Sequence, residues 1–245
     1  MFDAVLANKA SFSRPLEDAQ KQPREDLVTS ALFGTLRFLT LAGQAKALTA
    51  LLGEDVESSA LQDIYLWPRL QSDREESEPD VVIRFQGDSY WVVEVKWGAP
   101  LNDDQVGREI RSVQEGHCLK DMLPDRQRNV IGYTLLGMLD RHRTHMDVAR
   151  HNMEEEIRFL EVRWPELPDR LDKLARTCDD PGLKAWANLA ADFIRNQPEG
   201  RVLGPWPDLQ VPPPMFFCFD TNEFFALPSC LVAVPESLFE FTRKI

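Results

Sequence analysis

The chain of 245 residues has few cysteines and no long apolar run, and both shortages restrict what it can be. The cysteines are Cys118, Cys178, Cys218 and Cys230. They are widely spaced and form no CxxC pair, so we expect buried free thiols rather than a disulfide framework or a zinc ribbon. No apolar run approaches the roughly 20 residues that a membrane-spanning helix needs. The N-terminus lacks the basic-then-apolar order of a signal peptide, so a cytoplasmic protein is expected.

Two phosphate-binding motifs are also missing. The sequence has no GxxxxGK[ST] and no GxGxxG, so nucleotide-driven motor chemistry is not indicated. Histidine is scarce, with four in the chain. His142 and His145 have a spacing that could bind metal, but no third ligand accompanies them, and a solvated helix face is the simpler interpretation.

Positive charge is in short supply, since 28 Lys and Arg residues face 40 Asp and Glu residues and the formal net charge is -12. Proteins that bind nucleic acid normally use clustered Lys and Arg. One stretch is richer in basic residues, namely Arg108, Arg111, Lys120, Arg126, Arg128, Arg141, Arg143 and Arg150. This stretch could form a local cationic wall, which interleaved acids such as Glu109 would weaken. A partner subunit is the alternative source of substrate affinity.

Hydrophobic periodicity and turn residues predict a mixed order of elements. We expect helices over 23–39, 43–53, 102–116, 139–161 and 184–196, and strands over 63–70, 80–86, 89–97 and 130–135. The two middle strands form a hairpin through Gln86–Ser89, whose residues favour a turn. This order predicts an α/β fold with a small mixed sheet flanked by helices and a mostly helical C-terminal part. The last thirty residues are strongly apolar and should pack on the core.

The hairpin carries the residues that could do chemistry. Glu94 and Lys96 are two positions apart on a strand, so they project from one face. Asp80 joins that face if the hairpin loop has an odd length, and a loop centred on Asp88 would pair position 80 with position 96. A two-residue turn at Gly87 and Asp88 would instead put Asp80 on the other face.

These residue types suit phosphodiester hydrolysis. Two carboxylates, from Asp80 and Glu94, and the main-chain carbonyl of Val95 are hard oxygen ligands for Mg²⁺ or Mn²⁺. Such a metal lowers the pKa of a bound water and polarises the phosphodiester. Lys96 adds positive charge where negative charge grows in the transition state.

Pro79-Asp80 followed by Glu94-Val95-Lys96 resembles the PD-(D/E)xK nuclease superfamily, whose members include restriction and repair endonucleases. The resemblance covers about residues 23–135 and implies a restriction-endonuclease-like core over 1–140. Residues 141–245 would form a helical and apolar extension packed on that core, and a single domain also fits. In the family an N-terminal helix often contributes a Glu, which Glu25 matches. The helix after the hairpin often contributes a Gln, which Gln105 matches.

Each residue also has a structural explanation. Glu94 and Lys96 could form a cross-strand salt bridge, although the apolar strand around them suggests burial, where charges are rare unless paired or functional. Asp80 could be a turn residue after Pro79, with Glu78 as the alternative ligand. Glu25 could simply favour a first helical turn. Gln105 could close a capping box onto Asn102.

The resulting hypothesis is a Mg²⁺- or Mn²⁺-dependent phosphodiesterase that cleaves nucleic acid, with DNA as the first choice and RNA as the alternative. Family resemblance implies roles such as prokaryotic defence or DNA maintenance. A homo-oligomer or a partner protein would supply substrate affinity. The rival hypothesis is a catalytically silent nuclease fold that serves as an interaction or assembly subunit.

Overall fold

The fold was analysed in a computed structural model that describes residues 25–58, 60–71, 76–97, 101–102, 104–119, 123, 128–137, 143–153 and 157–196. A mixed five-stranded sheet has the order β1-β4-β5-β7-β8. Its strands are β1 (Leu61–Leu66), β4 (Val81–Phe85), β5 (Ser89–Val95), β7 (Asn129–Gly137) and β8 (Arg158–Arg163). The strand β4 runs antiparallel to both of its neighbours, β1 and β5, whereas β5, β7 and β8 run parallel to one another. A second, antiparallel sheet has the order β3-β2-β6 and consists of β2 (Leu70–Gln71), β3 (Glu76–Ser77) and β6 (His117–Cys118).

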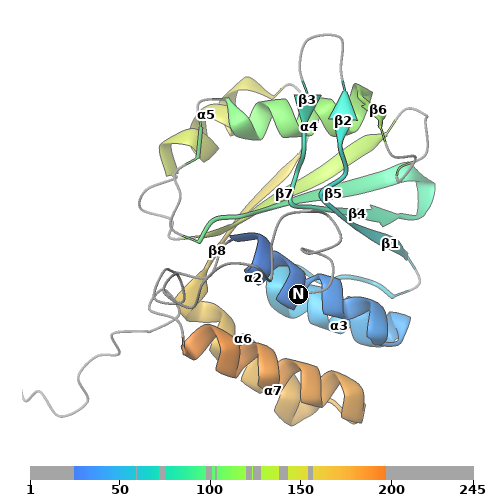
Figure 1. The fold of residues 1–245 in the computed structure, drawn as a ribbon, viewed down its shortest axis with the longest axis vertical. Coiled ribbons are helices and arrows are strands. Elements are labelled where there is room, and N and C mark those ends of the chain that lie inside the picture. The colour runs from blue at the N-terminus through green and yellow to red at the C-terminus, as the bar shows by residue number, and fades with distance from the viewer. Residues whose placement is uncertain are drawn as a thin grey trace, which may run out of the picture. The chain divides into compact units, whose positions relative to one another are not determined.

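Helices cover both faces of the large sheet (Figure 1). On one face lie α4 (Gln105–Glu115) and α5 (Arg143–Asn152), and on the other lie α2 (Glu25–Leu32), the 3-10 helix η2 (Gly34–Phe38) and α3 (Leu41–Leu52). The pair α6 (Leu167–Thr177) and α7 (Pro181–Arg195) packs beyond α3, after the short 3-10 helix η5 (Trp164–Glu166). Each side of the sheet has its own apolar core. The expected α/β class with a mixed sheet and flanking helices is therefore confirmed.

The β4–β5 hairpin has an odd-length loop, as the chemistry requires. Val81 pairs with Val93 and Val82 with Val92, and the loop is the 3-10 turn η3 (Gln86–Asp88). Its centre is Gly87, with a φ of 71°, a left-handed conformation that glycine adopts without strain. The prediction of a loop centred on Asp88 was wrong by one residue, because the turn uses the residue without a Cβ. The register continues to place position 80 opposite Glu94 instead of Lys96, which leaves it on the predicted face.

The first predicted helix is shorter than expected. We expected 23–39, whereas α2 ends at Leu32 and the chain continues as η2. The hydroxyl of Thr35 donates to the Ala31 carbonyl at 2.7 Å, a local bond typical of a helix that tightens near its end. The second helix, expected over 43–53, begins earlier, at a Thr40 cap that accepts from the Gly43 amide, and ends at Gly53 as predicted.

The region after β7 differs most from the prediction. The expected helix over 139–161 was wrong, because it merges α5 with the strand β8. The sequence RFLEVR of β8 is short and half of its residues are charged, so periodicity alone does not separate it from a stretch of helix. Its pairing with β7 places residues beyond 140 in the same sheet as the hairpin. The helix α6 was not predicted, whereas α7 confirms the helix expected over 184–196 and begins three residues earlier.

Two further expectations concern thiols and membranes. Cys118 and Cys178 are free, and Cys178 is buried, whereas Cys218 and Cys230 lie outside the described residues. The proline-rich stretch from 204 and the apolar C-terminal stretch lie outside them as well. No helix within the described ranges combines the length and the apolar character that a bilayer crossing needs.

Candidate active site

The candidate site lies at the carboxyl end of β5. Tyr90 and Val92 face the α4 side of the sheet, so the alternation of a strand puts Glu94, and Lys96 just beyond the strand, on the same side. Both charged side chains are buried, with 3% of Glu94 and 8% of Lys96 exposed. Charges this deep in a protein are rare unless they are paired or functional. The expectation that this pair is buried is confirmed.

Asp80 reaches the same strand end from the start of β4. Its Oδ2 accepts from the Val95 amide at 2.9 Å, and its Oδ1 accepts from the Trp67 indole Nε1 at 3.2 Å. The main-chain oxygen of Asp80 also accepts from the Trp67 amide at 3.0 Å. Because N–H and C=O of one strand residue point to the same edge, the Val95 carbonyl points toward the Asp80 side. The structure therefore brings Asp80, Glu94 and the Val95 carbonyl to one corner of the sheet.

Lys96 lies between two carboxylates. Its Nζ is 2.6 Å from Glu94 Oε1 and 3.6 Å from Glu25 Oε2. Glu25 also accepts from the Trp97 amide through Oε1, at 2.8 Å. The first residue of α2 thus attaches this helix to the strand end. Glu25, predicted from the N-terminal helix, therefore lies at the candidate site. Its place in the first turn of α2 also suits the helix dipole.

Gln105, the first residue of α4, makes one contact at the helix start and two with carboxyls of the site. Its Oε1 accepts from the Asn102 amide at 3.1 Å, which is the bond of the predicted capping box. Its Nε2 donates to Glu94 Oε1 at 2.6 Å and to Glu109 Oε1 at 2.8 Å. The helix begins at Gln105 and its cap is the left-handed Asp104, with a φ of 55°, so the prediction that Asn102 caps this helix was wrong by two residues.

Two residues of the site were not predicted as such. Glu109 lies one turn after Gln105 on α4 and is 3% exposed, and its Oε2 accepts from the Tyr133 hydroxyl of β7 at 2.8 Å. In the sequence, Glu109 stands out only as an acid within a basic stretch. The available signal was its place on the apolar face of the helix, three residues after Val106 and four before Val113.

Burial and mutual repulsion raise the pKa of the site carboxyls. Burial raises the pKa of Glu94 to about 8, and the nearby Glu109 adds to this while Lys96 opposes it. Burial raises the pKa of Glu109 to about 7 against the hydrogen bonds from Gln105 and Tyr133. Burial and then Glu94 raise the pKa of Asp80 well above its usual value. The carboxyls therefore compete for one lysine and bind protons more tightly than exposed acids do.

The pKa values of Lys96 and Tyr133 are raised as well. Burial works against the charge of Lys96, but Glu94, followed by Glu25 and Asp80, raises the pKa of this lysine above its usual value. The ammonium therefore stays charged. Burial and the charge of Glu109 raise the pKa of Tyr133, which keeps this hydroxyl a hydrogen-bond donor.

The donor set fits a hard divalent cation in chemistry. Asp80, Glu94 and the Val95 carbonyl provide oxygens only, which suits Mg²⁺ or Mn²⁺. Both described contacts of Glu94 fall on Oε1, which leaves Oε2 as the atom that a cation could take. Among the described residues, no group of three or more His, Cys, Asp or Glu side chains is arranged to hold a metal ion. Glu78, the alternative to Asp80, instead accepts from Arg69 at 2.7 Å.

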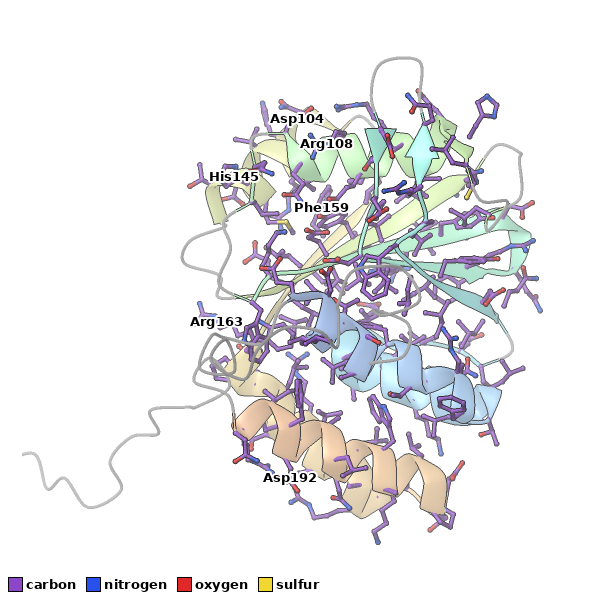
Figure 2. All side chains as sticks on the ribbon, in the orientation of Figure 1. Asp104, Arg108, His145, Phe159, Arg163 and Asp192 are labelled. Atoms are coloured by element: carbon purple, nitrogen blue, oxygen red, sulfur yellow. The ribbon has the colours of Figure 1, made fainter. Side chains whose placement is uncertain are left out.

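The expected cationic wall is largely committed to other contacts. Arg111 pairs with Asp104 at 2.6 Å, and Arg150 pairs with Asp147 at 2.9 Å. The guanidinium of Arg128 is buried and donates to the carbonyls that end α4. Side chains of this region lie over the α4–α5 layer, where Asp104, Arg108 and His145 are labelled in Figure 2. Lys120, Arg126 and Arg141 lie outside the described residues.

No family model, no curated protein and no solved structure matches this chain.

Proposed function

We propose that this chain is a metal-dependent phosphodiesterase that cleaves nucleic acid, with DNA as the favoured substrate. The observation that carries the proposal is the placement of Lys96. Its ammonium is 2.6 Å from Glu94, on the same face as Asp80, at a strand end where two helices begin. A structural salt bridge needs one acid and one base, whereas this site gathers an excess of acids around one lysine.

The proposed reaction is hydrolysis of a phosphodiester. A water oxygen bonds to phosphorus, one P–O ester bond breaks, and the leaving oxygen receives a proton. Asp80, Glu94 and the Val95 carbonyl would hold Mg²⁺ or Mn²⁺, whose chemistry at such a site is to polarise the phosphodiester and to lower the pKa of a bound water.

The side chains of the chain itself divide the remaining tasks. Lys96 supplies fixed positive charge beside the phosphate, where negative charge increases in the transition state. Glu25 accepts from the Trp97 amide and faces Lys96, so it holds the ammonium near the strand end. Gln105 donates to Glu94 and restricts the orientation of that carboxylate.

The architecture agrees with a restriction-endonuclease-like core, which we include in the proposal. A hairpin carries Asp80 and Glu94-Val95-Lys96, a preceding helix carries Glu25 and a following helix carries Gln105, in the order that the PD-(D/E)xK resemblance implies. We place the proposed activity in the cytoplasm, with DNA maintenance or defence as the expected setting. The acidic composition favours a partner protein or a second copy of the chain as the source of substrate affinity.

A second candidate is a catalytically silent subunit with the same fold. This candidate is favoured by the contacts of the described arginines with Asp104, Asp147 and main-chain carbonyls. These contacts leave little positive charge to bind a polyanion. The acid-rich surroundings of Lys96 favour the enzyme.

The test is cleavage of supercoiled plasmid, single-stranded DNA and structured RNA by the full chain with Mg²⁺ or Mn²⁺. We expect cleavage that EDTA abolishes and that Lys96→Ala lowers by about a hundredfold or more. Lys46→Ala is the matched control, because Lys46 is exposed on α3, away from the site. Equal cleavage by wild type and Lys96→Ala would refute the role of Lys96. Failure of the wild type to bind either metal in calorimetry would refute the enzyme and leave the silent subunit.

A further inference from the structure

We infer that Glu109 and Tyr133 are positioning residues that fix the Gln105 amide, and through it the Glu94 carboxylate, for a divalent cation. This inference rests on the proposed function, because it assigns the second layer of the same site. Its basis is a continuous chain of hydrogen bonds that links β7, α4 and β5. The links are Tyr133 to Glu109, Gln105 to Glu109, and Gln105 to Glu94.

The amide of Gln105 has its orientation determined by its surroundings. Only its oxygen can accept, and the Asn102 amide donates to it at 3.1 Å. The NH₂ group must therefore face the two carboxylates, and each of its hydrogens has an acceptor, at 2.6 Å in Glu94 and 2.8 Å in Glu109. A flipped amide would leave buried donors and acceptors unsatisfied, which is costly inside a protein.

Glu109 is in turn held at both of its oxygens. Oε1 accepts from Gln105 and Oε2 accepts from Tyr133, and both contacts are 2.8 Å. Glu109 is 3% exposed and Tyr133 is fully buried on β7, a strand paired on both sides by β5 and β8. A rigid strand thus supports the helix side chain, and the helix side chain supports the amide that touches Glu94.

A purely structural purpose explains this chain of bonds poorly. Two carboxylates on one amide lie close together in a buried site, since Glu94 Oε1 is 2.6 Å and Glu109 Oε1 is 2.8 Å from Gln105 Nε2. An apolar residue at position 109 would avoid this repulsion and extend the core formed by Val106, Ile110 and Val113. Retaining the acid makes sense if an oriented Glu94 is what the site needs. Ligands of protein metals are usually oriented by such outer partners.

The test compares variants that keep the hydrogen bonds with variants that remove them. In Glu109→Gln the new amide can accept from Gln105 and donate to the Tyr133 oxygen, so the arrangement is retained without the charge. Glu109→Leu removes both bonds and keeps an apolar fit, and Tyr133→Phe removes one. The control is Ser112→Ala on α4, because Ser112 is 1% exposed and its hydroxyl has no partner among the described residues.

Affinity for Mg²⁺ would be measured by calorimetry at about pH 9, above the pKa of Glu94 at about 8, so that protons compete little. We expect Glu109→Leu to weaken binding by about ten- to a hundredfold. Tyr133→Phe should weaken it by about fivefold, the loss of one hydrogen bond. Glu109→Gln and Ser112→Ala should bind as the wild type does. Cleavage by Glu109→Leu should recover at saturating Mg²⁺, because positioning changes the metal dependence and not the reacting groups.

Several outcomes would overturn the inference. Unchanged Mg²⁺ affinity in both Glu109→Leu and Tyr133→Phe would exclude positioning while leaving the proposed function intact. Equal weakening in Glu109→Gln and Glu109→Leu would assign the effect to charge instead of hydrogen bonds. A wild type that binds no Mg²⁺ would refute the proposed function itself. If Glu109→Leu fails to fold, Tyr133→Phe decides the matter.

Discussion

Replacing Glu94 with glutamine should change how the stability of the folded chain depends on pH, because glutamine has no carboxyl to ionise. Burial, with help from Glu109, raises the pKa of Glu94 from 4.5 to about 8. The folded chain therefore binds more protons than the unfolded chain between these two values. Stability consequently falls as the pH rises through this window. Glu94→Gln has no proton to lose there, so its stability relative to the wild type should rise from acid to alkaline pH.

The magnitude follows from the proton affinity. Each factor of ten in proton affinity is worth about 1.4 kcal/mol, so the rise of the Glu94 pKa from 4.5 to about 8 sets a ceiling of about 5 kcal/mol for this relative gain. Glu94 and Glu109 titrate as a coupled pair, which divides the effect, and we expect a gain of about 2 to 4 kcal/mol between pH 5 and pH 9. Glu94→Gln also loses the ion pair with Lys96. That ion pair exists only where Glu94 is ionised, so its loss is already contained in the pKa of Glu94, which Lys96 lowers.

The assay is urea unfolding in EDTA at several pH values between about 5 and 9. Glu115→Gln serves as the control, because Glu115 is exposed at the end of α4. A Glu94→Gln difference that stays constant with pH, or that shrinks toward alkaline pH, would refute the picture of a buried carboxyl forced toward its protonated form.

Three further predictions concern the metal and the support of the site. Affinity for Mg²⁺ should rise from pH 6 to pH 9, by up to about tenfold per pH unit for each proton released, because the proton on Glu94 competes with the cation; calorimetry in two buffers of different ionisation enthalpy would count the protons released. Trp67→Phe removes the indole donor to Asp80 and should weaken Mg²⁺ binding by about tenfold; an unchanged affinity would contradict this. Gly132→Ala should cost about 1 to 3 kcal/mol in urea unfolding, because a Cβ there would lie 2.5 Å from the ring of Trp91; full stability would show that the ring can move.

The convergence of Asp80, Glu94 and Lys96 could be predicted because the face on which Asp80 lies depends only on whether the hairpin loop has an odd or an even number of residues. Any odd-length loop puts Asp80 on the Glu94 face, so an error of one residue in the loop centre did not alter the outcome. The Gly87 turn determines which residue lies opposite Asp80, and local sequence alone did not distinguish Gly87 from Asp88 as the centre. Glu25 could be proposed but not placed, since its contact with the Trp97 amide spans 72 positions of the chain.

The parts that escaped prediction depend on distant contacts. Glu109 becomes a site residue only because Tyr133, 24 positions later, donates to it from a neighbouring strand. The strand β8 is identified by its pairing with β7, whereas its six residues alone suit either a strand or a helix. Gln105 shows a related difficulty, since its amide oxygen makes the predicted contact with Asn102 while its NH₂ group contacts Glu94.

The scarcity of positive charge in the chain and the crowding of acids at the site have a common consequence. Glu94 and Glu109 are buried, Asp80 is half-buried beside them, and Lys96 is the cation that they share. Like charges at such short range cannot all stay ionised without compensation, so the site must bind either protons or a cation. A divalent cation would satisfy the acids and also bring positive charge to a surface on which Arg111 and Arg150 are already paired. The acidic composition that first argued against a nucleic-acid enzyme is therefore compatible with one whose affinity for phosphate comes from its metal and its partner.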